Sequence, residues 1–233
     1  EIEQLVNEFG IKDIQMFDDT FTLNLKRVED ICNMLIERKV DVGWNCMTRV
    51  DKVTVDLFNL MKKAGCYEVG FGIESGSDRV LKFIKKSVTT DQIRKAVEMA
   101  KKAGIDVRGF FMLGFPTETK EEIMQTINFA KELNVDVAQF MIATPYPGTE
   151  MWKIAQENGK INNEDWSDFT FYAPDKMPFS SELFTEKELL SLYKKAYRSY
   201  YLRSSFIFKQ IQKIRSFSDM YRNWLAIKGI TGF

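Results

Sequence analysis

Residues 69–77, V-G-F-G-I-E-S-G-S, decide how the rest of the chain is interpreted. The alternating valine, phenylalanine and isoleucine favour a buried strand, and the glycines between them leave room for another group to approach the backbone. Glu74 and Ser75 follow, at the strand end where parallel α/β proteins bind ligands. A carboxylate beside a hydroxyl suits the two hydroxyls of a ribose. The same two residues could equally start a loop and cap the next helix.

Composition limits the classes of protein to consider. The chain has 233 residues, with 33 Lys and Arg balanced by 33 Asp and Glu, so we expect one large domain or one domain with an appendage. A formal charge of zero gives no support for DNA binding. No apolar run reaches the roughly 18 residues of a membrane helix, and no signal peptide is visible. We therefore expect a cytoplasmic protein with no transmembrane segment and no DNA partner.

The residues that usually bind metals are scarce. The sequence contains no histidine, which excludes histidine-dependent triads and histidine metal sites within it. Its three cysteines, Cys32, Cys46 and Cys66, lie well apart and form no pair motif. They predict neither a disulfide framework nor a metal site, and Cys46 is expected to be a small buried hydrophobic residue. We predict no metal ligands in this chain.

A pattern of helix, glycine and apolar strand repeats through the first two thirds of the chain. Gly10, Gly65 and Gly104 each stand where a helix would end. Thr89 with Gln92, and Thr119 with Glu122, predict capping boxes at two helix starts, and residues 1–9 predict a first helix. The predicted strands are residues 13–17, 42–47, 67–73, 107–113 and 136–142. Strands that alternate with single helices should lie parallel and be covered by those helices.

The periodic pattern fades after residue 147. Residues 151–160 predict a short helix, and residues 162–178 predict an aromatic-rich loop that packs on itself, covers a barrel end or lines a substrate. A basic, aromatic helix is predicted from residue 185 to about residue 213, and another over residues 216–233. The basic helix could contact a membrane, an acidic partner or RNA, or simply pack one face on the barrel. We expect a core of residues 1–155 and an extension of residues 156–233.

Loops of polar, Gly and Pro residues follow all five predicted strands. Barrel enzymes build their active sites from such loops, which converge on one face. Each loop also has a simpler interpretation: turn residues at Asp18 and Asp19, an ion pair of Arg49 with Asp51 or a neighbouring helix, a turn at Gly114 and Pro116, and helix capping by Glu118.

Several strings together resemble the radical S-adenosylmethionine (SAM) enzymes. The closest branch often carries an N-terminal cobalamin-binding domain and includes proteins similar to magnesium-protoporphyrin monomethyl ester cyclase. The resemblance covers roughly residues 1–155 in the family's order. The matching strings are M-F-D-D-T-F-T (16–22), W-N-C-M-T-R-V-D (44–51), M-K-K-A-G-C-Y-E-V-G-F-G-I-E-S-G-S (61–77), V-L-K-F-I-K-K (80–86), G-F-F-M-L-G-F-P-T-E-T (109–119) and P-Y-P-G-T-E (145–150).

The resemblance implies an α/β fold, a partial TIM-type (β/α)6 barrel, here with a helical C-terminal extension. In the family the first strand leads into a C-x-x-x-C-x-x-C loop that binds a [4Fe-4S] cluster, at which SAM is cleaved to a 5′-deoxyadenosyl radical. This sequence has no such motif. We therefore expect the first strand and the cluster ligands to lie outside this chain, which would be inactive alone.

By position, the resemblance implies that Glu74 and Ser75 contact the SAM ribose. Lys86 would approach the ribose or the methionine carboxylate. Arg49 would face the same cavity and pair with the SAM carboxylate or a substrate acid. The loop of Asp18, Asp19 and Thr20 occupies the place where family members hold the methionine amino group.

The same correspondence assigns adenine to the fourth and fifth strands. Gly114 and Phe115 would pass behind the base, and backbone from Ala143 to Pro145 would recognise its edge. The family usually has glycine where Thr117 stands here, which puts the turn in doubt but not the strand. No catalytic residue is identified.

The implied partners are a small-molecule substrate, a reductant such as flavodoxin or ferredoxin, and cobalamin in a preceding domain. An anaerobic setting is expected because a primary carbon radical must be kept from oxygen. Two other functions stay open: a radical methylthiotransferase acting on tRNA, and a non-catalytic barrel scaffold. The sequence identifies neither the substrate nor the reaction, whether methylation, cyclisation or rearrangement, nor the oligomeric state.

Overall fold

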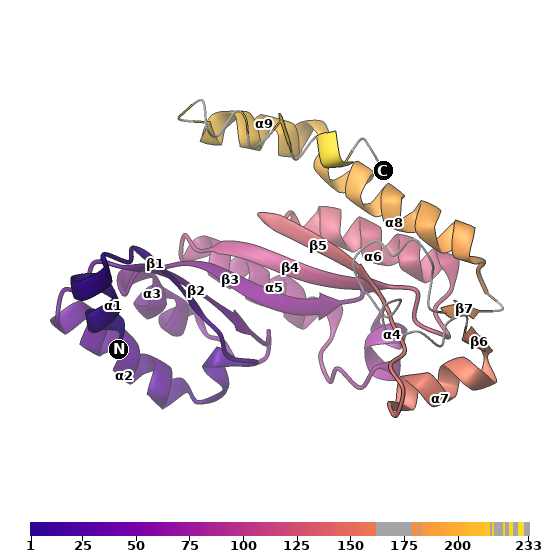
Figure 1. Cartoon of the computed structure of the whole chain (residues 1–233), viewed down its shortest axis with the longest axis horizontal. Coiled ribbons are helices and arrows are strands. Elements are labelled where there is room, and N and C mark those ends of the chain that lie inside the picture. The colour runs from indigo at the N-terminus through magenta and orange to yellow at the C-terminus, as the bar shows by residue number, and fades with distance from the viewer. Residues whose placement is uncertain are drawn as a thin grey trace. The chain divides into compact units, whose positions relative to one another are not determined.

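The computed structural model describes residues 1–161, 179–181, 183–214, 216, 221, 224, 225 and 228–230. The aromatic loop predicted at residues 162–178 and most of the helix predicted at residues 216–233 lie outside these residues. Within them, strands and helices alternate along the first two thirds of the chain (Figure 1).

Five strands form one sheet in the order β1-β2-β3-β4-β5. Neighbours from β1 to β4 pair in parallel, as expected for strands joined by helices. All five predicted strands are confirmed, each end within one residue. Their bounds are Asp13–Met16 (β1), Gly43–Thr48 (β2), Cys66–Glu74 (β3), Asp106–Leu113 (β4) and Val137–Ile142 (β5).

Most connecting helices begin at a polar residue whose side chain caps the helix. Asn24, Thr54 and Ser77 each accept a backbone hydrogen bond at a helix start, and both predicted capping boxes, at Thr89 and Thr119, are present. These caps satisfy N–H groups that have no partner within the helix. The elements are α1 (Ile2–Phe9), the 3-10 turn η1 (Phe21–Leu23), α2 (Leu25–Glu37), α3 (Val55–Lys63), α4 (Asp78–Phe83), α5 (Thr90–Lys102) and α6 (Lys120–Leu133).

The predicted glycine ends are also confirmed. Gly10, Gly65 and Gly104 all have positive φ. At Gly65 the requirement is strict, because φ is +95° and an added Cβ would lie 2.3 Å from the carbonyl oxygen of Val42. Any side chain there would displace the start of β2.

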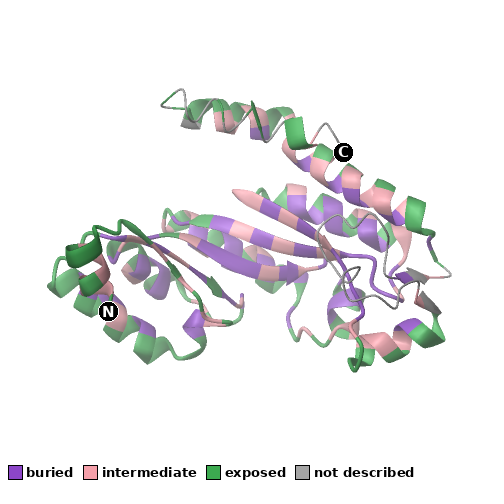
Figure 2. Cartoon of the chain, in the orientation of Figure 1, coloured by how far each residue is buried: buried purple, intermediate pink, exposed green. Residues whose placement is uncertain are grey.

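The chain divides into two compact units, residues 1–111 with 132–139, and residues 112–131 with 140–233. In the first unit the core lies on one face of the sheet. Val69, Phe71 and Ile73 of β3 are 0% exposed, and Phe71 meets Phe58 of α3 edge-on. Burial alternates strictly along β4 and β5 (Figure 2). Each fully buried large apolar side chain contributes about 1.5–3 kcal/mol. The other face of β3 carries Gly72 and Glu74, which are only partly buried.

The second unit departs from the predicted helices in two places. α7 (Glu150–Glu157) stops before residue 160, because Gly159–Ile161 forms β6, antiparallel to β7 (Phe179–Ser181). The single helix predicted from residue 185 is two helices, α8 (Glu186–Tyr201) and α9 (Ser204–Lys213). Arg203 interrupts them with an extended backbone, and its guanidinium stacks 4.0 Å from the Tyr200 ring. The predicted division at residue 155 stays a prediction.

One face of α8 is buried by packing within this unit. Leu189, Tyr193, Ala196 and Tyr200 are buried, and the Tyr197 hydroxyl both donates to the carbonyl oxygen and accepts from the N–H of Phe140. Burial raises the pKa of Tyr197 well above its ordinary value. The simpler interpretation of the basic segment, a helix packed on the barrel by one face, is therefore confirmed for α8. Among the described residues, no helix is long and apolar enough to cross a membrane.

Candidate functional site

The end of β3 places a carboxylate where a ligand can reach it. Glu74 is the last residue of the strand and has a left-handed backbone, with φ of +66°. Lys86 donates from Nζ to Oε1 of Glu74 at 2.8 Å, and the two side chains are 19% and 17% exposed. Partial burial strengthens this ion pair relative to a surface pair, yet leaves it accessible. The structure thus brings together two of the predicted residues.

Gly72 makes the room for this pair. A Cβ added there would lie 2.7 Å from Oε1 of Glu74 and 2.8 Å from Nζ of Lys86. The prediction that a group approaches the backbone closely at this glycine is confirmed, and the group is the ion pair of the chain itself. The space over this glycine is thus filled by the charged ends of Glu74 and Lys86, which stay partly exposed.

Ser75 is fully buried, unlike its neighbour. Its Oγ accepts a hydrogen bond from the N–H of Ser77 at 3.1 Å, which closes a tight turn. Ser77, in turn, caps α4 by accepting from the N–H of Val80. The alternative that Glu74 and Ser75 cap the next helix is therefore wrong in detail, because the cap is Ser77.

Arg49 follows β2 and is already engaged by the protein. It forms a bidentate pair with Asp51, with Nε to Oδ1 at 2.9 Å and Nη2 to Oδ2 at 3.2 Å. Nη2 also donates to the carbonyl oxygen of Lys86 at 3.3 Å. Burial raises the pKa of Asp51, but the hydrogen bond and charge of Arg49 outweigh it, and the pKa lies below its ordinary value. The interpretation of Arg49 and Asp51 as an ion pair is confirmed.

The loop after β1 forms its own local network. Asp18 accepts from the N–H of Thr20 at 3.2 Å and from Arg27 Nη2 at 2.8 Å, so the turn interpretation is confirmed for Asp18. The Arg27 hydrogen bond, aided by that of Thr20, lowers the pKa of Asp18. Asp19 is exposed. Among the described residues, no hydrogen bond joins this loop to Glu74, and its place at the SAM amino group stays a prediction.

The predicted adenine residues lie in the second unit, where a buried carboxylate organises the turn after β4. Glu118 is 0% exposed and accepts from the N–H groups of Gly114 at 2.7 Å and Phe115 at 3.1 Å. Gly114 has φ of +84°, which confirms the turn interpretation. The capping role suggested for Glu118 is wrong, because Thr119 and Glu122 form the capping box. Sequence reasoning missed this role, whose only signal was a glutamate four residues after a strand-end glycine.

The backbone expected to recognise adenine is partly occupied. Ala143 and Pro145 are buried, and the N–H of Ala143 donates to the carbonyl oxygen of Leu113 at 2.9 Å. That N–H therefore serves the sheet. Recognition of adenine by the remaining backbone groups from Ala143 to Pro145, or by Gly114 and Phe115, stays a prediction.

The cysteines do not fit an iron–sulfur cluster. Cys32, Cys46 and Cys66 are all buried free thiols, on α2, β2 and β3. Burial raises the pKa of Cys32 to about 12, and a hydrogen bond with Cys46, together with burial, raises that of Cys66 further. A cluster needs thiolates, and among the described residues no group of three candidate ligands could hold a metal.

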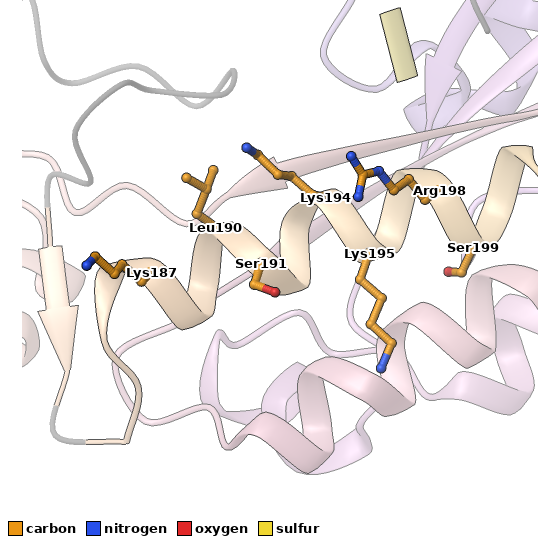
Figure 3. A pocket seen from close by; sticks show the side chains of 7 residues that line it. All are labelled: Lys187, Leu190, Ser191, Lys194, Lys195, Arg198 and Ser199. Carbon is orange, nitrogen blue, oxygen red and sulfur yellow. The ribbon is translucent and has the colours of Figure 1, made fainter. Parts of the chain in front are cut away.

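A surface hollow of ≈ 610 Å³ lies elsewhere, along α8. Its described lining is basic and polar apart from one leucine: Lys187, Leu190, Ser191, Lys194, Lys195, Arg198 and Ser199. In Figure 3, Lys194 and Arg198 project from one side of the helix, whereas Lys195 projects from the opposite side. Because these cations diverge, they do not enclose a single ligand.

Comparisons with known proteins agree with the geometry. Residues 1–130 match the family model described as Radical SAM superfamily. The uncharacterized methyltransferase PH0819 of Pyrococcus horikoshii is 43% identical over 211 residues, 91% of this chain and 45% of that protein. The anaerobic magnesium-protoporphyrin IX monomethyl ester cyclase of Rubrivivax gelatinosus is 29% identical over 210 residues, 89% of this chain and 37% of that protein. The chain thus spans less than half the length of these two relatives.

A solved structure shows a similar fold. It is that of the radical S-adenosylmethionine methyltransferase TsrM from Kitasatospora setae, with a TM-score of 0.62 and 19% sequence identity. The match covers 71% of this chain and 35% of that chain. At this identity the similarity establishes the α/β fold of the family.

Proposed function

The chain belongs to the radical SAM superfamily, and on that premise we propose that it forms the SAM-binding part of a radical SAM enzyme. The observation that carries the proposal is the half-shielded pair of Glu74 and Lys86 over Gly72, at the carboxyl end of β3. It combines a charged acceptor, a lysine ammonium and a glycine that leaves room for both, at the strand end where α/β proteins bind ligands.

In the proposed complex, the ribose hydroxyls of SAM donate to the Glu74 carboxylate. Oε1 holds Lys86, and an ionised carboxylate has about four acceptor positions, so both oxygens retain capacity for a hydroxyl. Lys86 would keep Glu74 oriented and screen its charge. When bound, SAM supplies the 5′-deoxyadenosyl group that starts radical chemistry, and the protein contributes binding and orientation.

The cluster, the reductant, the substrate and the type of reaction are proposed from the family and its named members. The described cysteines do not fit a [4Fe-4S] cluster, so the expectation that its ligands lie outside this chain stays a prediction. A reductant such as flavodoxin or ferredoxin, and a small-molecule substrate, are proposed from the family. We favour methyl transfer with cobalamin in another part of the protein, because PH0819 and TsrM are both named methyltransferases.

The rival functions have less support. A methylthiotransferase acting on tRNA would need an RNA-binding surface, and the aromatic face of α8 is used for packing within its own unit. A non-catalytic scaffold would not require an accessible charged pair over a glycine at β3.

The test is SAM binding with Glu74→Gln, measured by isothermal titration calorimetry in anaerobic protein that carries its cluster. We expect SAM to bind about ten- to hundredfold more weakly, because the variant loses a charge-assisted acceptor. Glu98→Gln is the matched control, since Glu98 also pairs with a lysine, Lys102, but lies 63% exposed on α5. Unchanged SAM affinity in Glu74→Gln, with the protein folded, would place the ribose elsewhere.

A further inference from the structure

We propose that Arg49 is a positioning residue for the ribose site: it fixes the loop that carries Lys86, and acts on the ligand only through Lys86 and Glu74. This inference rests on the proposed function, in which Glu74 receives the ribose. It replaces the expectation that Arg49 itself pairs with the SAM carboxylate.

The loop after α4 needs an external support. Lys85 and Ser87, on either side of Lys86, both have φ of +57°. Left-handed backbone is unfavourable at a residue other than glycine, so two such residues in three positions are held by contacts around them. The Lys86 N–H donates to the carbonyl oxygen of Leu81 at 2.9 Å, which ties one side of the loop to α4.

Arg49 supplies the tie on the other side. Its Nη2 donates to the carbonyl oxygen of Lys86, the same residue whose ammonium meets Glu74. The N–H, the carbonyl oxygen and the ammonium of Lys86 are therefore bound by three different elements: α4, the segment after β2, and β3. A residue tied at these three points has little freedom to move its ammonium away from Glu74.

Asp51 makes Arg49 rigid enough for this role. The bidentate pair fixes the plane of the guanidinium, with the two side chains 34% and 25% exposed. A lysine could not reproduce it, because one ammonium cannot form two parallel hydrogen bonds to a carboxylate and also point a separate donor at a carbonyl oxygen. The order of action is Asp51, Arg49, Lys86 and then Glu74.

The experiment compares two ligands in Arg49→Lys. SAM carries both the ribose and the methionine carboxylate, whereas 5′-methylthioadenosine keeps the ribose and lacks the carboxylate. If Arg49 acts through Lys86 and Glu74, both ligands bind more weakly by the same factor, about three- to tenfold. Asp51→Asn, which keeps Arg49 but loosens it, should weaken both ligands in the same way. Arg94→Lys is the matched control, because Arg94 also binds a carboxylate through two nitrogens, that of Glu132.

A double-mutant cycle provides the second readout. In a Lys86→Met background, Arg49→Lys should have no further effect on either ligand, because the residue through which it acts is gone. Circular dichroism and thermal unfolding of each variant check that it is folded.

Two results would overturn the inference. Weaker binding of SAM alone would mean that Arg49 contacts the carboxylate directly, and unchanged binding of both ligands would mean that it has no role. Failure of the proposed function is seen separately, as an unchanged affinity for both ligands in Glu74→Gln.

Discussion

The ends of β3 and β4 use the same residue types in opposite ways. Each joins a glycine to a glutamate a few residues later, Gly72 with Glu74 and Gly114 with Glu118. Glu74 is 17% exposed and meets a side-chain ammonium. Glu118 is 0% exposed and accepts from two backbone N–H groups. A buried carboxylate bound by two backbone N–H groups fixes a turn, whereas a partly exposed carboxylate bound by one ammonium keeps acceptor positions for a ligand.

The two glycines differ for the same reason. Gly114 has φ of +84°, and a Cβ there would lie 2.7 Å from Leu189 of α8. Gly72 lies in β3, and its nearest neighbours are the flexible ends of Glu74 and Lys86. We expect the first glycine to matter mainly for folding of its unit, and the second mainly for the proposed SAM site.

The largest expected effect is on folding, from Glu118→Ala. This change leaves two buried N–H groups without their acceptor and opens a cavity, so we expect the free energy of unfolding to fall by about 3 kcal/mol or more. Urea denaturation measures it. Glu121→Ala is the control, because Glu121 is exposed in the first turn of α6, and it should change stability by about 0.5 kcal/mol or less. Equal effects of the two variants would mean that Glu118 does not organise the turn.

The next effect separates the two glycines directly. Gly114→Ala should lower the free energy of unfolding by about 2 kcal/mol, because it combines left-handed backbone with overpacking against Leu189. Gly72→Ala should lower it by less than about 1 kcal/mol, since only side-chain ends must move. The same Gly72→Ala change should weaken SAM binding about tenfold, because it separates Lys86 from Glu74.

Denaturation and SAM titration of both variants check this contrast. If Gly72→Ala destabilised the protein as much as Gly114→Ala while leaving SAM affinity intact, the distinction between a folding glycine and a site glycine would fail.

The sequence predicts the elements of the fold better than it predicts the contrast between the ends of β3 and β4. The five strands and the two capping boxes were predictable, because alternating apolar residues, Thr-x-x-Gln or Thr-x-x-Glu, and glycine after a helix are local signals. The ion pair of Arg49 and Asp51 was also foreseeable, since the residues are two positions apart. The resemblance placed Glu74 and Lys86 near one ligand, and the structure does bring them together.

What escaped prediction depends on residues distant in sequence. Glu118 is a structural residue because its surroundings bury it, and the glycine four positions before it does not by itself distinguish it from an exposed capping glutamate. The break between α8 and α9 depends on Arg203, which stacks on Tyr200 and donates to the carbonyl oxygen of Lys131 at 3.3 Å. The left-handed backbone of Glu74 likewise has no sequence signal, because glutamate rarely adopts it.

The smallest expected effect on stability concerns a third glutamate, whose side chain is more exposed than those of Glu118 and Glu74. Glu188 lies in the first turn of α8 and accepts from Lys120 Nζ at 2.6 Å and from the N–H and hydroxyl of Thr185. The Lys120 hydrogen bond, with those of Thr185, lowers the pKa of Glu188 from 4.5 to about 2. Because the folded-state pKa is depressed, this stabilisation is fully present above about pH 4.5 and is lost as the pH falls toward 2.

Glu188→Gln should therefore be less stable than the natural sequence near neutral pH, and the difference should shrink as the pH falls from about 4.5. Urea denaturation of both proteins at several pH values measures the difference. It should be small, and smaller still in about 1 M salt, because solvent screens an exposed pair. A difference independent of pH would show that Glu188 stabilises the protein through hydrogen bonds that do not depend on its charge. Ionic stabilisation by glutamates in this chain would then require partial burial, as at Glu74.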